Sequence, residues 1–375
     1  MSAGGPFFSV GENSIRHLRD AREAYPAMLD AIRGARFEVL LEMYWIAADR
    51  VGLEFRDALV ERAAAGVTVR VIYDAIGSIR LPADFWEPLL VAGGEVTQFG
   101  PISPWRRHFR LLRLRFRDHR KVLVCDVTTA FTGGINLASP WLPVSEGGAA
   151  WRDDAVELRG PAGRQLRTLF YDTWWDLSGS RPANARPGVR QARRGVWVLA
   201  NMFRGRPDRS IRRAYLLAIR RARASIDITA CYFLPGPALL RALIAAHRRG
   251  VRLRILVPLR SDVPMIDLAM QSILVRLVRE GIAVYAFHER VLHSKTGIVD
   301  ARYVTIGSYN LDAQSLHFNL ESNVAIDDRR FAEAVTRSFD DDLEMARRLD
   351  LALLRAAPLR TRFLAWWAAR LRAFL

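Results

Sequence analysis

The sequence predicts an α/β protein that contains two copies of one structural unit. Apolar runs with strand periodicity alternate with amphipathic, helix-like segments along the chain, and this alternation is typical of sheets covered by helices. The same order of segments occurs twice, and each copy ends in the same polar motif. We therefore expect two similar halves, related by a pseudo-two-fold axis, with a shared site at their interface.

The repeat consists of three helix–strand pairs in each half. In most of them an amphipathic helix closes on glycine before an alternating strand begins. The matching segments are 25–49 with 212–236, 59–74 with 243–258, and 89–99 with 276–287. Because the order of all three pairs agrees, we interpret the chain as a duplication.

The duplication divides the chain into four parts. We expect a first half over residues 1–177 and a second half over 195–350. Residues 178–194 are rich in Pro, Gly, Ser and Arg and are typical of a linker. Residues 351–375 form a basic tail.

The composition limits the class of partner and the cellular setting. The chain has 375 residues, a net charge of +17 and a pI near 10.9, which favours an anionic partner such as nucleic acid, an anionic membrane or a phosphorylated substrate. Cys125 and Cys231 lie in strand-like runs and are expected to be buried free thiols in a reducing compartment. We find neither a signal peptide nor an apolar stretch long enough to span a membrane.

A polar motif recurs with identical spacing near the end of each half. Both copies contain His-x-Lys-x4-Asp, followed by a Gly and later an Asn. The residues are His119, Lys121, Asp126, Gly133 and Asn136 in the first half and His293, Lys295, Asp300, Gly307 and Asn310 in the second. Alternate residues of a strand share a face, so each His and Lys should project together. A neighbouring strand can return each Asn beside them.

This set of side chains suits phosphoryl or phosphatidyl transfer. A neutral imidazole can attack phosphorus and hold a covalent intermediate, and a second, protonated imidazole can give a proton to the leaving alkoxide. Two Lys and two Asn can stabilise the charge on the phosphate oxygens. Lys121 and Lys295 are also the chain's two lysines among 56 Lys and Arg residues. A compact ammonium fits beside a crowded phosphorus where a planar guanidinium does not.

Two HxKx4D motifs in one chain resemble the signature of the phospholipase D superfamily. The likeness covers roughly residues 10–345 and is greatest to bacterial cardiolipin synthases of the short form without N-terminal transmembrane helices. Supporting stretches are "GGIN", "WRDDAVELRGPAG" and "GSYNLDAQSLHFNLESNVAI". The resemblance implies two α/β/α sandwich halves and a reaction that joins two phosphatidylglycerols into cardiolipin and glycerol, with no metal or cofactor.

The resemblance also implies roles for individual residues. His119 becomes the nucleophile and His293 the acid, while Lys121, Lys295, Asn136, Asn310 and Ser308 bind phosphate oxygens. An acidic residue orients each imidazole; Asp153, with the adjacent Asp154 as the alternative, is the candidate in the first half, and Glu321 is the candidate in the second. The motif places Asp126 and Asp300 in the catalytic set, although we expect them to hold the strand–turn architecture. Gly134 stands where the second half has Ser308, and Gln314 where Arg is expected.

Two basic segments indicate where the chain meets lipid. Residues 104–117 carry six Arg, three aromatic residues and no acid, and 358–375 carry four Arg with Trp366 and Trp367. Such segments suit the interface of an anionic membrane, so we expect a peripheral protein on the cytoplasmic side of the inner membrane. A phospholipase that uses water, a nuclease, and a non-catalytic binding protein are the alternatives. We expect no obligatory nucleic acid, and the sequence leaves the oligomeric state open.

Overall fold

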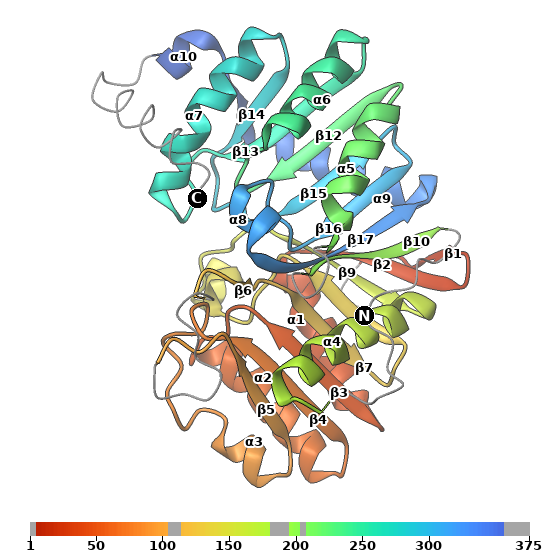
Figure 1. Ribbon diagram of the computed structural model, residues 1–375, viewed down its shortest axis with the longest axis vertical. Coiled ribbons are helices and arrows are strands. Elements are labelled where there is room, and N and C mark those ends of the chain that lie inside the picture. The colour runs from red at the N-terminus through yellow and green to blue at the C-terminus, as the bar shows by residue number, and fades with distance from the viewer. Residues whose placement is uncertain (1–4, 104–113, 181–194, 203–207, 356–375) are drawn as a thin grey trace.

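A computed structural model describes residues 5–103, 114–180, 195–202 and 208–355. It contains two β-sheets, each in its own half of the chain, and Figure 1 shows the first half below the second. Most of the basic insertion, most of the linker and nearly all of the tail lie outside the described residues. Among the helices that are described, none is both long enough and apolar enough to cross a membrane.

The first sheet has eight strands in the order β1-β2-β9-β8-β7-β3-β4-β5. Strands β3, β4 and β5 run parallel, and the remaining neighbours are antiparallel. The strands are β1 Phe8–Val10, β2 Asn13–Arg19, β3 Glu38–Met43, β4 Thr68–Asp74, β5 Glu95–Phe99, β7 Lys121–Cys125, β8 Thr129–Gly133 and β9 Asp154–Arg159.

The second sheet repeats this order along its path β11-β10-β17-β16-β15-β12-β13-β14-β18. Its strands are β10 Val196–Met202, β11 Asp208–Arg209, β12 Ser225–Ala230, β13 Arg252–Pro258, β14 Ala283–Phe287, β15 Lys295–Val299, β16 Tyr303–Gly307, β17 Asn319–Asp327 and β18 Ala346–Arg348. The short β6, Arg117–Asp118, pairs with β17 and so joins the halves. The matching strand orders confirm the predicted α/β fold.

Helices cover both faces of each sheet. Those of the first half are α1 Asp20–Gly34, α2 Arg50–Ala64, α3 Glu87–Val91 and α4 Pro161–Ser178; two short 3-10 helices span Ser139–Trp141 and Val144–Glu146. Those of the second half are α5 Ser210–Arg221, α6 Pro237–Arg248, α7 Pro264–Arg279, α8 Ala313–His317, α9 Arg329–Glu344 and α10 Leu351–Arg355. Helices α4 and α9 pack in a shared apolar core with strands of both sheets. The other long helices pack in two outer cores, one for each half.

Local sequence signals explain where these helices begin and end. The Asp49 carboxylate accepts hydrogen bonds from the Val51 and Gly52 N–H groups at the start of α2, and Asp328 accepts one from Phe331 at the start of α9. These acceptors satisfy N–H groups that have no partner inside the helix. After α2 and α6 the backbone turns through Gly66 and Gly250, whose φ angles are +85° and +91°. Glycine adopts this left-handed conformation without steric cost, as the repeat predicts.

Asp126 and Asp300 organise the far ends of the central strands and lie outside the site of His and Lys. The Asp126 carboxylate accepts hydrogen bonds from the N–H groups of residues 36–38, and Asp300 does the same for residues 223–225. Each Asp lies five positions after its Lys, which is roughly 16 Å along a strand. Their place in a catalytic set is therefore wrong, because the strand that aligns the motif also carries the Asp away from the imidazole.

We predict that Asp126→Ala lowers the free energy of unfolding by about 1–3 kcal/mol, because several N–H groups lose their acceptor. Urea unfolding followed by circular dichroism measures the effect. Asp57→Ala, which removes an exposed carboxylate paired with Arg56, is the matched control and should change stability by less than about 0.5 kcal/mol. An Asp126→Ala midpoint equal to that of the control would contradict the structural role.

Candidate active site

The two HxK segments lie where the central strands β7 and β15 begin. Strand β7 starts at Lys121 and lies between β3 and β8; strand β15 starts at Lys295 and lies between β12 and β16. The two His and two Lys residues are buried, with relative exposures of 3–8% for the whole residue. The spacing of the motif thus places each His and Lys at the same end of one strand.

Each asparagine lies across the end of its central strand. The Trp45 N–H, just after β3, donates to Asn136 Oδ1 at 3.1 Å, and Asn136 follows β8 on the other side of β7. In the second half the Cys231 thiol, just after β12, donates to Asn310 Oδ1 at 3.0 Å. Both amide oxygens are held by these bonds, so the NH2 group is the end of each amide that remains to bind an anion.

Backbone hydrogen bonds join each motif to the opposite half. The His119 N–H donates to the Leu320 carbonyl at 3.0 Å, next to the parallel pairing of β6 with β17. The His293 N–H donates to the Arg152 carbonyl at 2.7 Å, next to an isolated bridge between Arg152 and Leu292. In both cases the acceptor is the residue immediately before an acid, Glu321 or Asp153. The two contacts are equivalent under the pseudo-two-fold relation.

The carboxylates therefore cross the interface and orient the imidazole of the other half. His119 Nδ1 lies 3.0 and 3.1 Å from the two Glu321 oxygens, and His293 Nδ1 lies 2.7 Å from Asp153 Oδ2. The expectation that each acid orients the imidazole of its own half is wrong. The reason is the backbone contact across the interface, which brings the residue before each acid, Leu320 or Arg152, beside the other half's His. A carboxylate at Nδ1 favours the tautomer with a lone pair on Nε2.

Glu321 is held by a set of hydroxyl and amide donors. Ser308 Oγ, Ser315 Oγ and Asn319 Nδ2 all donate to its carboxylate. Burial by itself raises the pKa of Glu321, but His119, Lys121 and Ser308 together bring that pKa below its ordinary value. Ser308, predicted to bind phosphate, thus uses its hydroxyl to fix the carboxylate that orients His119.

The first-half counterpart of Ser308 has no room for a side chain. A Cβ atom on Gly134 would lie 2.1 Å from Asp153 Oδ1. The Asp153 carboxylate instead accepts hydrogen bonds from Trp141 Nε1 at 3.0 Å and from the Asp154 N–H at 2.9 Å. Gly134 thus leaves room for the Asp153 carboxylate, whose hydrogen-bond donors differ from those around Glu321.

Gln314 joins the end of the basic insertion to the second half. Its Nε2 donates to the Arg115 carbonyl and to Asn319 Oδ1, both at 2.9 Å. The Arg115 guanidinium lies 4.0 Å from the centre of the Phe318 ring. The residue that departs from the expected Arg thus anchors the segment beside the site.

The lysines lie against their own motif. Lys121 Nζ donates to the His119 carbonyl at 2.7 Å and lies 5.0 Å from the centre of the Tyr44 ring. Lys295 Nζ donates to the His293 carbonyl and lies 2.9 Å from His293 Nδ1. Each ammonium has three N–H donors, so donors remain for a second acceptor.

Burial shifts the protonation of this cluster. Burial lowers the pKa of His119 to about 4 in spite of Glu321, with further lowering from Lys121. Burial and Lys295 also lower the pKa of His293. Burial lowers the pKa of Lys121 to about 7, although Glu321 opposes the shift. Near neutral pH both imidazoles are therefore unprotonated.

Aromatic rings that the sequence reasoning missed surround the two imidazoles. The Tyr44 ring centre lies 4.8 Å from that of His119, and the Trp141 and Trp151 centres lie 5.3 and 5.7 Å from that of His293. The different rings make the two half-sites chemically unequal. The one available signal is that Trp151 lies two residues before Asp153.

Comparison with known proteins identifies relatives of this arrangement. The family model described as "Cardiolipin synthase, PLD-like domain" matches residues 215–343, which include the second motif. The chain is 32% identical over 341 residues to "Cardiolipin synthase 2" of Bacillus anthracis, covering 89% of this chain and 65% of that protein. It is also 32% identical over 353 residues to a cardiolipin synthase of Geobacillus thermodenitrificans, covering 92% and 69%. The chain thus spans about two thirds of the length of these curated relatives.

Solved structures share the fold. A phosphatidylserine synthase of Haemophilus influenzae superposes with a TM-score of 0.77 at 15% identity, covering 96% of this chain and 95% of that chain. A polyphosphate kinase of Porphyromonas gingivalis gives a TM-score of 0.61 at 15% identity, covering 95% of this chain and 53% of that chain. At these identities the likeness concerns the fold alone.

We predict that His119 remains neutral until the pH approaches 4. Its folded pKa of about 4 lies below the unfolded value of about 6.5, so the unfolded chain binds more protons between these values. The contribution of this residue to stability is complete above pH 6.5 and falls by roughly 3 kcal/mol as the pH drops to 4. Histidine NMR titration, with His119→Gln to assign the resonance, measures the midpoint. A midpoint near 6.5 would contradict the prediction.

Proposed function

The chain belongs to the cardiolipin synthase family of the phospholipase D superfamily, and from this we propose that it is a phosphatidyltransferase. It transfers the phosphatidyl group of one phosphatidylglycerol to a hydroxyl of a second, and the products are cardiolipin and glycerol. The observation that carries the proposal is the pair of buried imidazoles, each oriented at Nδ1 by a carboxylate of the other half.

In the first step His119 acts as the nucleophile. Its Nε2 lone pair attacks the phosphorus of phosphatidylglycerol, a P–N bond forms, and the bond between phosphorus and the glycerol oxygen breaks. His293 gives its Nε2 proton to that oxygen, so neutral glycerol leaves. The substrate's negative charge raises the pKa of a neighbouring imidazole, and this supplies the protonated His293 that the first step requires.

In the second step the phosphatidyl group moves from His119 to the acceptor. His293, now neutral, takes the proton from a hydroxyl of the second phosphatidylglycerol. The resulting oxygen nucleophile attacks phosphorus, the P–N bond breaks, and His119 is restored. Lys121, Lys295, Asn136 and Asn310 stabilise the negative charge on the phosphate oxygens in both steps. Ser308, Glu321 and Asp153 act as positioning residues.

The two basic segments favour a lipid substrate and a membrane location. We place the protein on the cytoplasmic side of the inner membrane, with anionic phospholipids contacted by 104–117 and 358–375. This placement rests on the basic, aromatic composition of both segments. A phospholipase that uses water as acceptor, or a nuclease, would need the same two imidazoles, so the products must distinguish the three reactions.

We predict that the purified protein makes cardiolipin and glycerol from phosphatidylglycerol vesicles in excess EDTA. His119→Ala and His293→Ala should each lower turnover by roughly a thousandfold or more, because the two imidazoles act as a unit. Lipid chromatography with glycerol detection measures both products. Exposed His288→Ala is the matched control and should retain turnover.

Three results would change the proposed function. Phosphatidic acid as the main product would make the protein a hydrolase, and DNA cleavage without lipid turnover would make it a nuclease. Full activity of either catalytic His→Ala variant would refute the two-imidazole mechanism. Mapping of the covalent phosphatidyl label in quenched turnover assigns the nucleophile, and label on His293 would exchange the two roles.

We further predict that Lys121→Arg lowers turnover by roughly a hundredfold or more, although the charge is kept. A planar guanidinium cannot occupy the buried space between the His119 carbonyl and the Tyr44 ring without displacing the phosphate. Initial rates at saturating lipid provide the measurement, and circular dichroism checks folding. The exposed exchange Arg164→Lys is the control. Near-normal turnover of Lys121→Arg would disprove the steric reason for lysine.

A further inference from the structure

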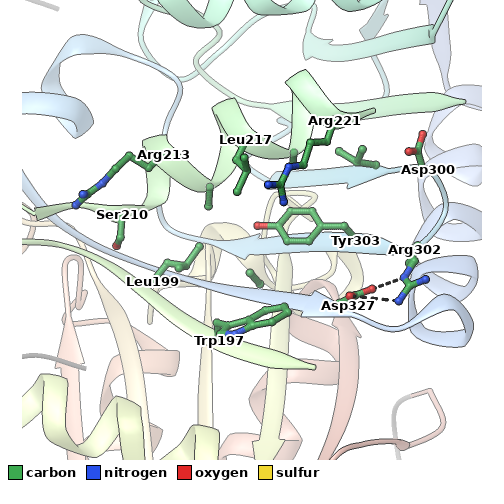
Figure 2. Close-up of a pocket in the computed structure, with 14 residues that line it drawn as sticks. Trp197, Leu199, Ser210, Arg213, Leu217, Arg221, Asp300, Arg302, Tyr303 and Asp327 are labelled. Atoms are coloured by element: carbon green, nitrogen blue, oxygen red, sulfur yellow. Dashed lines mark hydrogen bonds and ion pairs between the residues drawn. The ribbon is translucent and has the colours of Figure 1, made fainter. Parts of the chain in front are cut away.

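An open groove of about 760 Å³ lies on the outer face of the second half. Helix α5 forms one wall, and strands β10, β16 and β17 form the floor (Figure 2). Its lining includes neither imidazole nor any side chain described above as contacting one. The volume lies within the range of small-molecule pockets.

The floor of this groove, which we call the α5 groove, is apolar. Trp197 and Leu199 come from β10, Tyr303 comes from β16, and Ala325 comes from β17. Leu217 reaches over the floor from α5 and is 49% exposed (Figure 2). Leu199 and Ala325 are buried, Trp197 and Tyr303 are partly buried, and Leu217 is exposed. The last three side chains thus reach the surface side by side, an arrangement that marks a binding surface more often than an isolated exposed residue does.

The equivalent groove in the first half has a polar floor. Arg16 of β2 pairs with Glu157 of β9, as Trp197 of β10 pairs with Ala325 of β17. The smaller first-half groove, of about 430 Å³, is lined by this buried Arg16–Glu157 ion pair. The Phe7 ring lies over the Arg16 guanidinium at 4.7 Å. The second half thus has an apolar pair, Trp197 and Ala325, at the place where the first half has a buried ion pair.

The apolar character extends to two further matched positions. Thr129 and Asp30 line the first-half groove where the second half has Tyr303 and Leu217. Apolar side chains on an exposed surface are less favourable in free energy than polar ones, because water solvates them poorly. An apolar occupant removes that cost.

The rim of the α5 groove is cationic. Of the four Arg in helix α5, Arg213 and Arg221 line the groove, and Arg221 extends above Tyr303 (Figure 2). The two acids of the rim are already engaged, because Asp327 is paired with Arg302 and Asp300 accepts hydrogen bonds from backbone N–H groups. An apolar floor beneath a cationic rim is complementary to an apolar chain that carries an anionic head.

The chain's own undescribed segments do not match this charge. Residues 181–194 contain five Arg and no acid, and 356–375 contain four Arg and no acid. Either segment would bring like charges to the rim, which is unfavourable. An external anionic amphiphile has the opposite charge.

We propose that the α5 groove is a second lipid site, which holds one acyl chain of an anionic phospholipid with its phosphate at Arg221. The acyl chain covers Trp197, Leu217 and Tyr303. The site is separate from the pair of imidazoles, so it does not depend on the proposed reaction.

The test uses phosphatidylglycerol with a diazirine in one acyl chain, presented to the full-length His119→Ala/His293→Ala protein in neutral detergent. After photolysis, peptide mapping should find label on the peptides that contain Trp197, Leu217 or Tyr303. Adding Leu217→Glu and Arg221→Glu should lower that labelling by about tenfold or more, because the overhanging apolar group and the cation are both lost. Leu90→Glu with Arg164→Glu is the matched control, since Leu90 is 52% exposed and Arg164 is exposed outside the groove.

Several results would contradict the proposed lipid site. No label in the groove, equal labelling by a phosphatidylcholine analogue, or labelling that survives Leu217→Glu/Arg221→Glu would overturn the proposal. Chemical crosslinks from the groove to 181–194 or 356–375, with no lipid label, would overturn it in favour of the chain's own segments. Cardiolipin formation by Leu217→Glu/Arg221→Glu is measured separately with both His restored. If the protein with both His residues makes no cardiolipin, while its groove is labelled and Leu217→Glu/Arg221→Glu removes that label, the proposed function alone is refuted.

Discussion

The structure depends on the exchange of carboxylates between the two halves. His119 is oriented by Glu321 and His293 by Asp153, and each pair is buried at the interface. A buried carboxylate without its partner costs several kcal/mol, so neither half completes its own part of the site. Docking of the halves and assembly of the site are therefore one event. This explains why the backbone contacts beside both His residues also cross the interface.

Buried arginines fix this interface around the two motifs. Arg120, between His119 and Lys121, donates to Glu42 and Thr173 of its own half and to the Asn201 carbonyl of the other. Arg152 donates to Asp342 of the second half and to Asp154. Ser294, at the place of Arg120 in the second motif, donates to the same Asp154. The middle residue of each HxK motif thus ties the halves together with a different donor.

The sequence predicted the fold well because its signals are local. Helix–glycine–strand periodicity reports on neighbouring residues, and the repeated order determined which strands correspond. The crossed pairing of Asp153 and Glu321 could not be predicted, because spacing within one half says nothing about which residue approaches from the other. The reason for glycine at position 134 appears only in the structure, where the Asp153 carboxylate occupies the space that a side chain would need. Tyr44 and Trp141 lie in apolar stretches of the sequence. In such stretches an aromatic residue that contacts an imidazole cannot be told from an ordinary core residue.

The structure also sharpens the reason for the two lysines. Burial alone does not require lysine, since Arg120 and Arg152 are as deeply buried as Lys121 and Lys295. The arginines and lysines differ in the groups to which their N–H donors bind. The arginine forks are directed at carboxylates, hydroxyls and carbonyls of the protein, which suits a planar group with five N–H donors. Each lysine gives a hydrogen bond to the carbonyl of its own His and keeps a compact charge beside the imidazole, and Lys295 also lies 2.9 Å from His293 Nδ1. Arginine therefore bonds across the interface, whereas each lysine remains a compact cation with N–H donors left for a further acceptor.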